Sequence, residues 1–187
     1  MQPDAPLRWG YELLSSASYV PLFQTLKIMS HFASMQTQLV NPDALLKGLQ
    51  ALLTEHQINA IVEVHNPATL LENAYDASSP PQFANLIIRR SHLDTPNRYS
   101  LLDVGFKQNQ SGTFELIADD WDLRQNAIGY AIGNSTQFLR AVQVQYNIAI
   151  VQQTMSPHLW NHSQIQTLED GTKRLVLTQR PIEVITL

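Results

Sequence analysis

Cysteine is absent from this sequence of 187 residues. The absence excludes disulfide bonds, thiolate metal sites and thiol nucleophiles, and it fits a reducing compartment. Basic residues are also scarce, because 12 lysines and arginines face 16 acidic residues and leave a net charge of −4. Nucleic-acid-binding proteins usually present a basic field instead. No apolar run approaches the roughly 20 residues of a membrane helix, and the N-terminus lacks the pattern of a signal peptide. We therefore expect a soluble intracellular protein that neither binds nucleic acid nor spans a membrane.

The composition that remains is typical of a folded chain. Hydrophobic residues make up 44% of the sequence and charged residues 15%, which favours a globular protein over a disordered one. The length suits one domain with attachments. We expect an N-terminal extension over residues 1–28, a single domain over 29–180 and a C-terminal tail over 181–187. The extension carries Trp9 and Phe23, so either it docks on the domain or a partner, or translation starts at Met29.

The clearest local pattern is a central β-hairpin. Two runs that alternate between apolar and polar residues, 100–107 and 113–119, flank a turn-forming segment that ends in Gly112. The loop then has about five residues, and Gly112 suits a left-handed backbone position. Placing both apolar rows on one side of the sheet predicts the facing pairs Phe106 with Phe114, Val104 with Leu116, and Leu102 with Ala118.

Two long helices are predicted from their start signals and spacing. Asn41-Pro42-Asp43 opens the first, because asparagine caps a helix and proline suits its first position. Its buried face is predicted to hold Leu45, Leu46, Leu49, Leu52 and Leu53. Asn134-Ser135 opens a second helix that runs to about Thr154. Residues 142–150 also alternate as a strand would, but the length and the cap favour the helix.

The remaining strands complete an α+β fold. Strands are predicted over 31–39, over 60–65 with Ala60, Val62 and Val64 facing inward, over 85–90, and in a second hairpin over 164–168 and 172–178. Prolines predict a loop over 66–83, and residues 122–133 are predicted to be a connector. We expect a mainly antiparallel sheet of about five to seven strands, with two principal helices packed on one face.

Several motifs, in this order along the chain, resemble one known family. They are Met29-Ser30-His31-Phe32, Gln36-Thr37, Leu86-Ile87-Ile88-Arg89-Arg90, Asp103-Val104-Gly105-Phe106, Gly112-Thr113-Phe114-Glu115, Asp119, Glu169-Asp170-Gly171-Thr172 and Arg174-Leu175-Val176-Leu177. Together they are similar to the hypothetical chloroplast reading frame thirty-five family, which is found in cyanobacteria and red-algal plastids.

The resemblance covers about residues 29–178 and has two departures. The family's Gln-Arg-Tyr-Ala motif is replaced by Gln145-Tyr146-Asn147-Ile148, which lacks the arginine, and its Tyr-Gly loop is replaced by residues 72–76. The resemblance implies that the protein is located in the cytoplasm or a plastid stroma. It carries no activity that can be transferred residue by residue.

Acidic residues gather around the central hairpin. In the predicted register Asp103 faces Ile117, diagonal to both Glu115 and Asp119, and such an oxygen-rich group suits Mg²⁺ or Ca²⁺. The same residues also fit the solvated face of an antiparallel sheet, with Lys107 and Arg89 as ion-pair partners. A second pair, His158 and His162, has the spacing of a zinc site, but it lacks the glutamate of the protease motif and fits a surface turn better.

Trp121 lies between Asp120 and Asp122 and is the best candidate for a partner-binding residue. Aromatic residues anchor interfaces, and an acidic surround selects a basic partner. We expect no cofactor, because no catalytic constellation is visible. The sequence favours a non-enzymatic protein-interaction or assembly module with an unidentified protein partner. The alternative is a divalent-metal-dependent enzyme that uses Asp103, Glu115 and Asp119.

Overall fold

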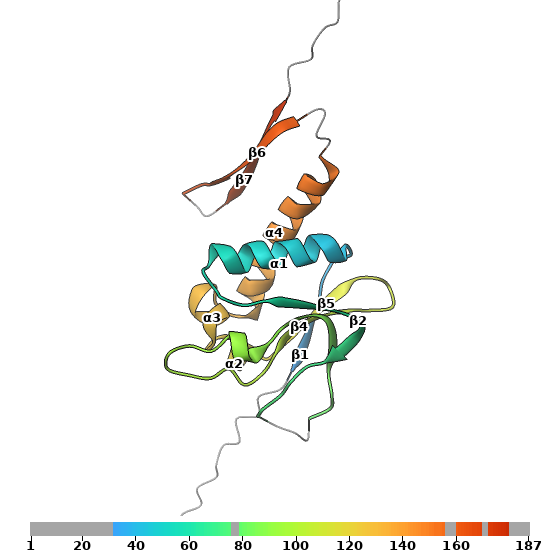
Figure 1. The fold of residues 1–187 in the computed structure, drawn as a ribbon, viewed down its shortest axis with the longest axis vertical. Coiled ribbons are helices and arrows are strands. Elements are labelled where there is room, and N and C mark those ends of the chain that lie inside the picture. Colours follow the sequence, from blue (N-terminus) through green and yellow to red (C-terminus); the bar gives the residue numbers. More distant parts are fainter. Residues whose placement is uncertain (1–31, 76–78, 156–159, 170–171, 180–187) are drawn as a thin grey trace, which may run out of the picture.

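The structure is a computed structural model that describes residues 32–75, 79–155, 160–169 and 172–179 (Figure 1). One antiparallel sheet has five strands in the order β1-β5-β4-β3-β2, and a second sheet has two, β6 and β7. The strands are β1 (Ala33–Gln36), β2 (Val62–Leu70), β3 (Phe83–Ile88), β4 (Val104–Gln108), β5 (Phe114–Ala118), β6 (Trp160–Thr167) and β7 (Lys173–Gln179). The helices are α1 (Pro42–Glu55), α2 (Asp120–Leu123), α3 (Ala127–Ala131) and α4 (Ser135–Thr154), with a 3₁₀ turn at Arg90–His92. The predicted α+β fold is confirmed, and none of the helices described here is long and apolar enough to cross a membrane.

The first predicted helix is α1. The Asn41 side chain accepts a hydrogen bond from the backbone N–H of Ala44 at 3.0 Å, as its capping role requires. The predicted apolar face is buried except for Leu46, which packs at the edge of the core. A Cβ atom on Gly48 would lie 2.8 Å from the backbone nitrogen of Tyr146. Glycine at this position therefore lets α1 approach α4 closely.

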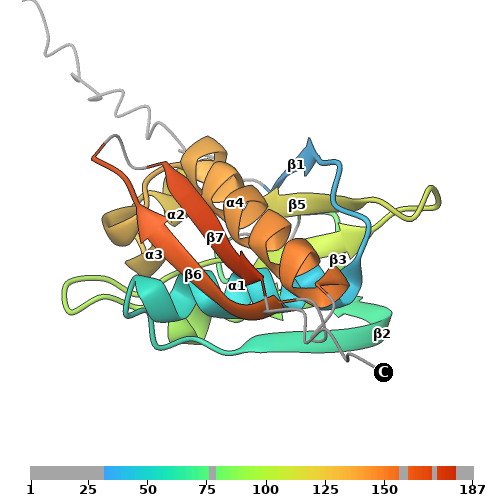
Figure 2. The ribbon, with the colours of Figure 1, turned by 90° about the horizontal axis from the view of Figure 1, so that it is seen from above.

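The second predicted helix is α4. Asn134 and Gln137 form a reciprocal capping box at its start, and Phe138 and Val142 are fully buried on one face. The alternative strand over 142–150 is therefore wrong, because a cap and a buried stripe at helical spacing outweigh the alternation. Residues of α1 and α4 share one hydrophobic cluster with sheet residues such as Phe106. Both helices thus cover the same face of the sheet, as predicted (Figure 2).

The central hairpin forms, with a corrected register. Phe106 faces Leu116 and Gln108 faces Phe114, so the predicted pairing of Phe106 with Phe114 is wrong by two residues. The apolar row keeps its side of the sheet because side chains repeat with a period of two. The Asn109 side chain accepts hydrogen bonds from the backbone N–H groups of Ser111 and Thr113, which closes the loop one residue later than predicted. Gly112 has a φ of 83°, as its predicted left-handed position requires.

Two other strand predictions need correction. β2 continues to Leu70 through Pro67, where a proline-containing loop was predicted, and its register shifts between Val64 and Thr69. β2 lies at the edge of the sheet, and edge strands and bulges tolerate a residue without an N–H group. Val64 lies opposite the core residue Leu86, on the predicted side of the sheet, but it is 61% exposed because the edge strand has a neighbour on one side only. The predicted strand over 100–107 begins only at Val104.

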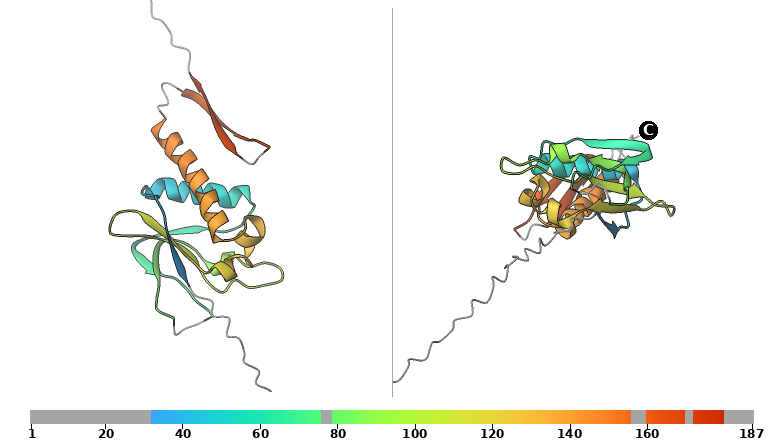
Figure 3. Two further views of the ribbon diagram at one scale, coloured as in Figure 1. Left: turned by 180° about the vertical axis from the view of Figure 1, so that it is seen from behind. Right: turned by 90° about the horizontal axis from the view of Figure 1, so that it is seen from below.

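The second hairpin, β6–β7, forms as predicted, with Ile165 facing Leu175. It lies on the far side of α1 from the five-stranded sheet (Figures 1 and 3). The Lys173 ammonium pairs with the Glu55 carboxylate at the end of α1. Of the hairpin side chains that the structure describes, none is buried. The proposed histidine pair, His158 and His162, falls outside the described side chains.

Candidate functional site

The three acids of the predicted metal site lie apart and have separate partners. Glu115 accepts hydrogen bonds from Ser34 Oγ at 2.7 Å and Gln36 Nε2 at 2.8 Å. Asp119 caps α2 by accepting from the backbone N–H of Asp122 at 2.7 Å. The corrected register places Gly105, not Asp103, opposite Ile117. Among the described residues, no group of three or more His, Cys, Asp or Glu side chains is placed to hold a metal ion.

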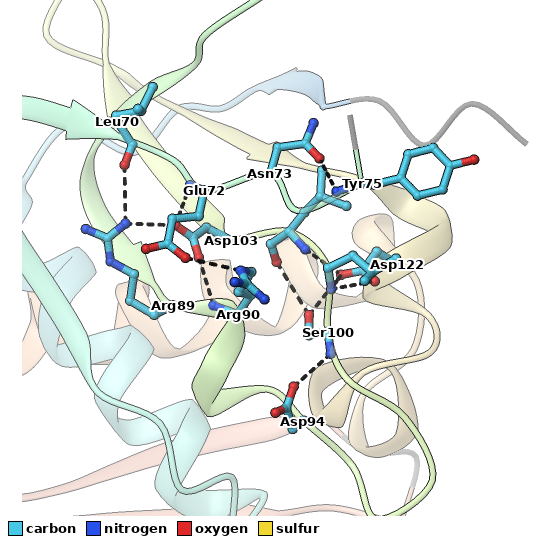
Figure 4. Close-up of polar contacts among 12 residues, drawn as sticks. Leu70, Glu72, Asn73, Tyr75, Arg89, Arg90, Asp94, Ser100, Asp103 and Asp122 are labelled. Carbon is cyan, nitrogen blue, oxygen red and sulfur yellow. Dashed lines mark hydrogen bonds and ion pairs between the residues drawn. The ribbon is translucent and has the colours of Figure 1, made fainter. Parts of the chain in front are cut away.

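Asp103 is instead the centre of a buried ion-pair network (Figure 4). Its carboxylate is fully buried. Oδ2 accepts from Arg89 Nη1 at 2.8 Å and from the backbone N–H of Glu72 at 2.7 Å, and Oδ1 accepts from the backbone N–H of Arg90 at 2.8 Å. Arg89 also donates to Glu63 on β2 at 2.7 Å. Asp103 therefore joins the start of β4 to the ends of β2 and β3.

The electrostatics of this network favour the charged forms of Arg89 and Glu63. Burial alone would lower the pKa of Arg89, but the hydrogen bonds and charges of Asp103 and Glu63 raise it. Burial alone would likewise raise the pKa of Glu63, but the hydrogen bonds from His65 and Arg89 and the charge of Arg89 hold it below its ordinary value. Both Asp103 oxygens already accept from close donors. The network therefore works as a structural clamp and offers no open ligand set.

Asp122 is the centre of a second buried network. It is 2% exposed and accepts from Ser100 Oγ at 2.9 Å and from the backbone N–H of Leu101 at 3.1 Å. Asp94 accepts from the backbone N–H of Ser100 at 2.8 Å, as Figure 4 also shows. The segment 89–102 is thus held near both of its ends by carboxylates. The prediction that Asp122 faces a partner needs correction, because its carboxylate is turned into the protein to satisfy these backbone donors.

The surround of Trp121 differs from the predicted acidic ring. The indole is 38% exposed, and the Arg98 guanidinium carbon lies 4.2 Å from the ring centroid. Asp120 pairs with Arg124 at 2.7 Å and accepts from the backbone N–H of Ser135 at 2.9 Å. Burial alone would raise the pKa of Asp120, but these two donors lower it. Trp121 is therefore flanked by the stacked Arg98 guanidinium and by the Asp120 carboxylate, whose charge is balanced by Arg124.

Two exposed tyrosines lie on segments that contact each other, because the backbone N–H of Ala127 on α3 donates to the Leu93 carbonyl of the 89–102 segment at 2.9 Å. Tyr99 in the 89–102 segment is 77% exposed and Tyr130 on α3 is 73% exposed, more than any other large apolar side chain that the structure describes. Tyr130 lines an open cavity of about 410 Å³ together with residues 94–97 of that segment and His56 at the end of α1. We call Tyr99, Trp121, Tyr130 and this cavity the aromatic end. Sequence reasoning missed both tyrosines. The one signal that could have found Tyr99 is the run of polar residues just before it, which is typical of an exposed turn.

The fold and these networks define an α+β protein in which two long helices cover one face of a five-stranded sheet and buried aspartates join the loops around it. The model of the DUF1257 family, a protein family of unknown function, matches residues 72–176. The matched range is more than half of the chain, so this protein belongs to the DUF1257 family. It includes Asp103, Asp122, the aromatic end apart from His56, and most of the β6–β7 hairpin. No curated protein and no solved structure matches the chain.

Proposed function

We propose that this protein is a non-enzymatic protein-interaction or assembly module and that the aromatic end is its docking surface. The observation that carries the proposal is the exposure of Tyr99 and Tyr130, at 77% and 73%, beside a backbone held by the exposed carboxylate of Asp94 and the buried carboxylate of Asp122. Large aromatic side chains are enriched among the residues that dominate binding energy. They provide a wide contact area while losing few rotamers on binding.

The fixed backbone supports this role because ordering a flexible loop weakens association. The backbone N–H groups of Ser100 and Leu101 are already held by Asp94 and Asp122. A partner therefore meets a surface whose backbone is organised before binding. The cavity beside Tyr130 adds a concave feature that a side chain of the partner can enter.

The divalent-metal enzyme lacks comparable support. A metal site needs oxygen ligands that converge at 2.0–2.6 Å from one ion. Asp103, Glu115 and Asp119 each bind different donors from different parts of the described structure.

The proposal is tested by quantitative affinity purification of the tagged full-length protein from its host. The double variant Tyr99→Ala/Tyr130→Ala should lose at least one co-purifying chain by about thirtyfold, as expected for hot-spot residues worth about 2 kcal/mol. The matched control is Phe83→Ala, which removes another exposed aromatic residue, 44% exposed, on β3. If the double variant and the control recover the same chains as the wild-type protein, the aromatic end is not the docking surface.

A further inference from the structure

The β6–β7 hairpin carries apolar side chains that the described residues of this chain do not fully bury. Ile165 is 42% exposed, and Leu175, Val176 and Leu177 are only partly buried. A two-stranded hairpin is at best marginally stable alone in water. The hairpin therefore needs a neighbour to become a stable element.

The rest of the chain covers the hairpin only in part. Lys173 is anchored to Glu55, but an open cavity of about 490 Å³ lies between Ile165 and Thr167 on β6 and Thr54 on α1. Viewed from above, the hairpin lies over α1 and α4 as a separate layer (Figure 2). β7 pairs only with β6 in the described structure, so one edge of β7 carries no ladder of hydrogen bonds.

The edge of β7 is blocked only at its start, where Lys173 and Arg174 lie and where Lys173 is paired with Glu55. Sheet edges are normally blocked by proline, by bulges or by inward-pointing charges. β7 has no proline, and the irregularity of the hairpin lies at its far end, between Trp160 and His162. The middle of β7 is apolar, whereas the facing residues of β6 are mostly polar: Ser163, Gln164, Ile165 and Gln166. β7 is therefore the edge better suited to a further strand.

The sequence of β7 is complementary to itself when two copies run antiparallel. With Val176 opposite Val176 of a second copy, Leu175 faces the second copy's Leu177, and Arg174 faces its Thr178. Apolar residues then meet apolar residues, and no basic side chain faces another over this span. Centring the pair on Arg174 instead would place the two arginines directly opposite each other. Centring it on Leu175 would place Arg174 opposite Val176, so apolar matching and charge separation together favour the register centred on Val176.

We propose that β7 pairs antiparallel with β7 of a second copy of this chain, centred on Val176. The two hairpins then form one four-stranded sheet across a two-fold axis. This gives each hairpin the further strands that a stable sheet needs. The second copy is favoured over an unrelated strand because the apolar and charged positions of β7 match themselves in this register.

Engineered disulfide formation tests the register directly, because the natural sequence has no cysteine. Facing residues of an antiparallel pair have Cα atoms about 4.5–5.5 Å apart, which a disulfide spans. Under mild oxidation, full-length Val176→Cys should become a covalent dimer. The control is Gln164→Cys, which lies opposite Val176 within the hairpin but on the far strand. It should remain mostly monomeric.

A charge exchange gives a second readout that needs no crosslink. The wild-type protein should have about twice the chain mass of 21.1 kDa when light scattering is measured at about 20 µM. Val176→Lys and Val176→Glu should each be monomeric, because each places like charges on the two-fold axis, and mixing them should restore the dimer. A monomeric wild-type protein, or equal crosslinking of Val176→Cys and Gln164→Cys, would overturn the proposal and leave the edge to a different chain.

Discussion

β4 of the five-stranded sheet and the end of β6 in the β6–β7 hairpin show a similar alternation of apolar and polar residues, yet of the two only β4 buries its apolar side chains. Phe106 on β4 is 1% exposed beneath α1 and α4, whereas Ile165 on β6 is 42% exposed. Alternation therefore predicts a strand in both regions, but a second layer of structure decides whether that strand has a core. The sheet has this layer within one chain, and the hairpin does not.

The largest effect of a substitution on the free energy of unfolding is expected in the five-stranded sheet, where α1 and α4 cover the apolar side chains. Phe106→Ala should lower the free energy of unfolding by about 3–5 kcal/mol, because it leaves a cavity against Phe138, whose ring centroid lies 6.4 Å away. Urea unfolding followed by circular dichroism measures this loss. A loss below about 1 kcal/mol would mean that the sheet is no better packed than the hairpin.

Asp103→Ala is expected to have the next largest effect. It removes the acceptor of two backbone N–H groups and leaves Arg89, whose side chain is 18% exposed, with Glu63 as its one remaining ion-pair partner among the described residues. Breaking such a pair should destabilise the protein by about 3 kcal/mol in the same urea assay. Asp43→Ala, which removes an exposed acid in the first turn of α1, is the control and should cost less than about 1 kcal/mol. Equal losses would argue against a clamp at Asp103.

The smallest effect is expected in the hairpin. Ile165→Ala should change the free energy of unfolding by no more than about 0.5 kcal/mol, because the side chain has little packing to lose. The measurement belongs at low protein concentration, so that pairing between copies does not contribute. A loss near 2 kcal/mol would show that the hairpin packs on α1 and α4 as firmly as a core strand, and the contrast between the two regions would fail.

Local signals explain which parts of the fold could be predicted from the sequence. α1 and α4 were predicted because Asn41 and Asn134 cap them and because their apolar residues follow helical spacing. The hairpin register was not, because the Asn109 side chain closes the loop through hydrogen bonds that spacing does not reveal. The course of β2 through Pro67 also depends on its place at the sheet edge, which only the assembled sheet defines.

The candidate site was harder to predict because its key groups are buried charges. Acidic residues are rarely buried unless they are paired. Asp103 was therefore predicted as a candidate metal ligand at the surface, and Asp122 as a candidate partner-binding residue. Their partners are an arginine and backbone N–H groups that lie far from them in the sequence, such as Glu72 for Asp103 and Leu101 for Asp122. Residue spacing carries no information about such donors. Trp121 on the short helix α2, for which a lid on the core was the other interpretation, is 38% exposed and stays a candidate partner-binding residue.

The open edge of β7 also makes the protein sensitive to its own abundance. If the hairpin gains its neighbour from a second copy, the fraction of ordered hairpins rises with the number of chains present, by mass action. A dilute chain would then keep its sheet and aromatic end while its hairpin stays unsupported. The same molecule would act as a single-site adaptor when scarce and as a two-headed scaffold when plentiful, with two aromatic ends held in one particle.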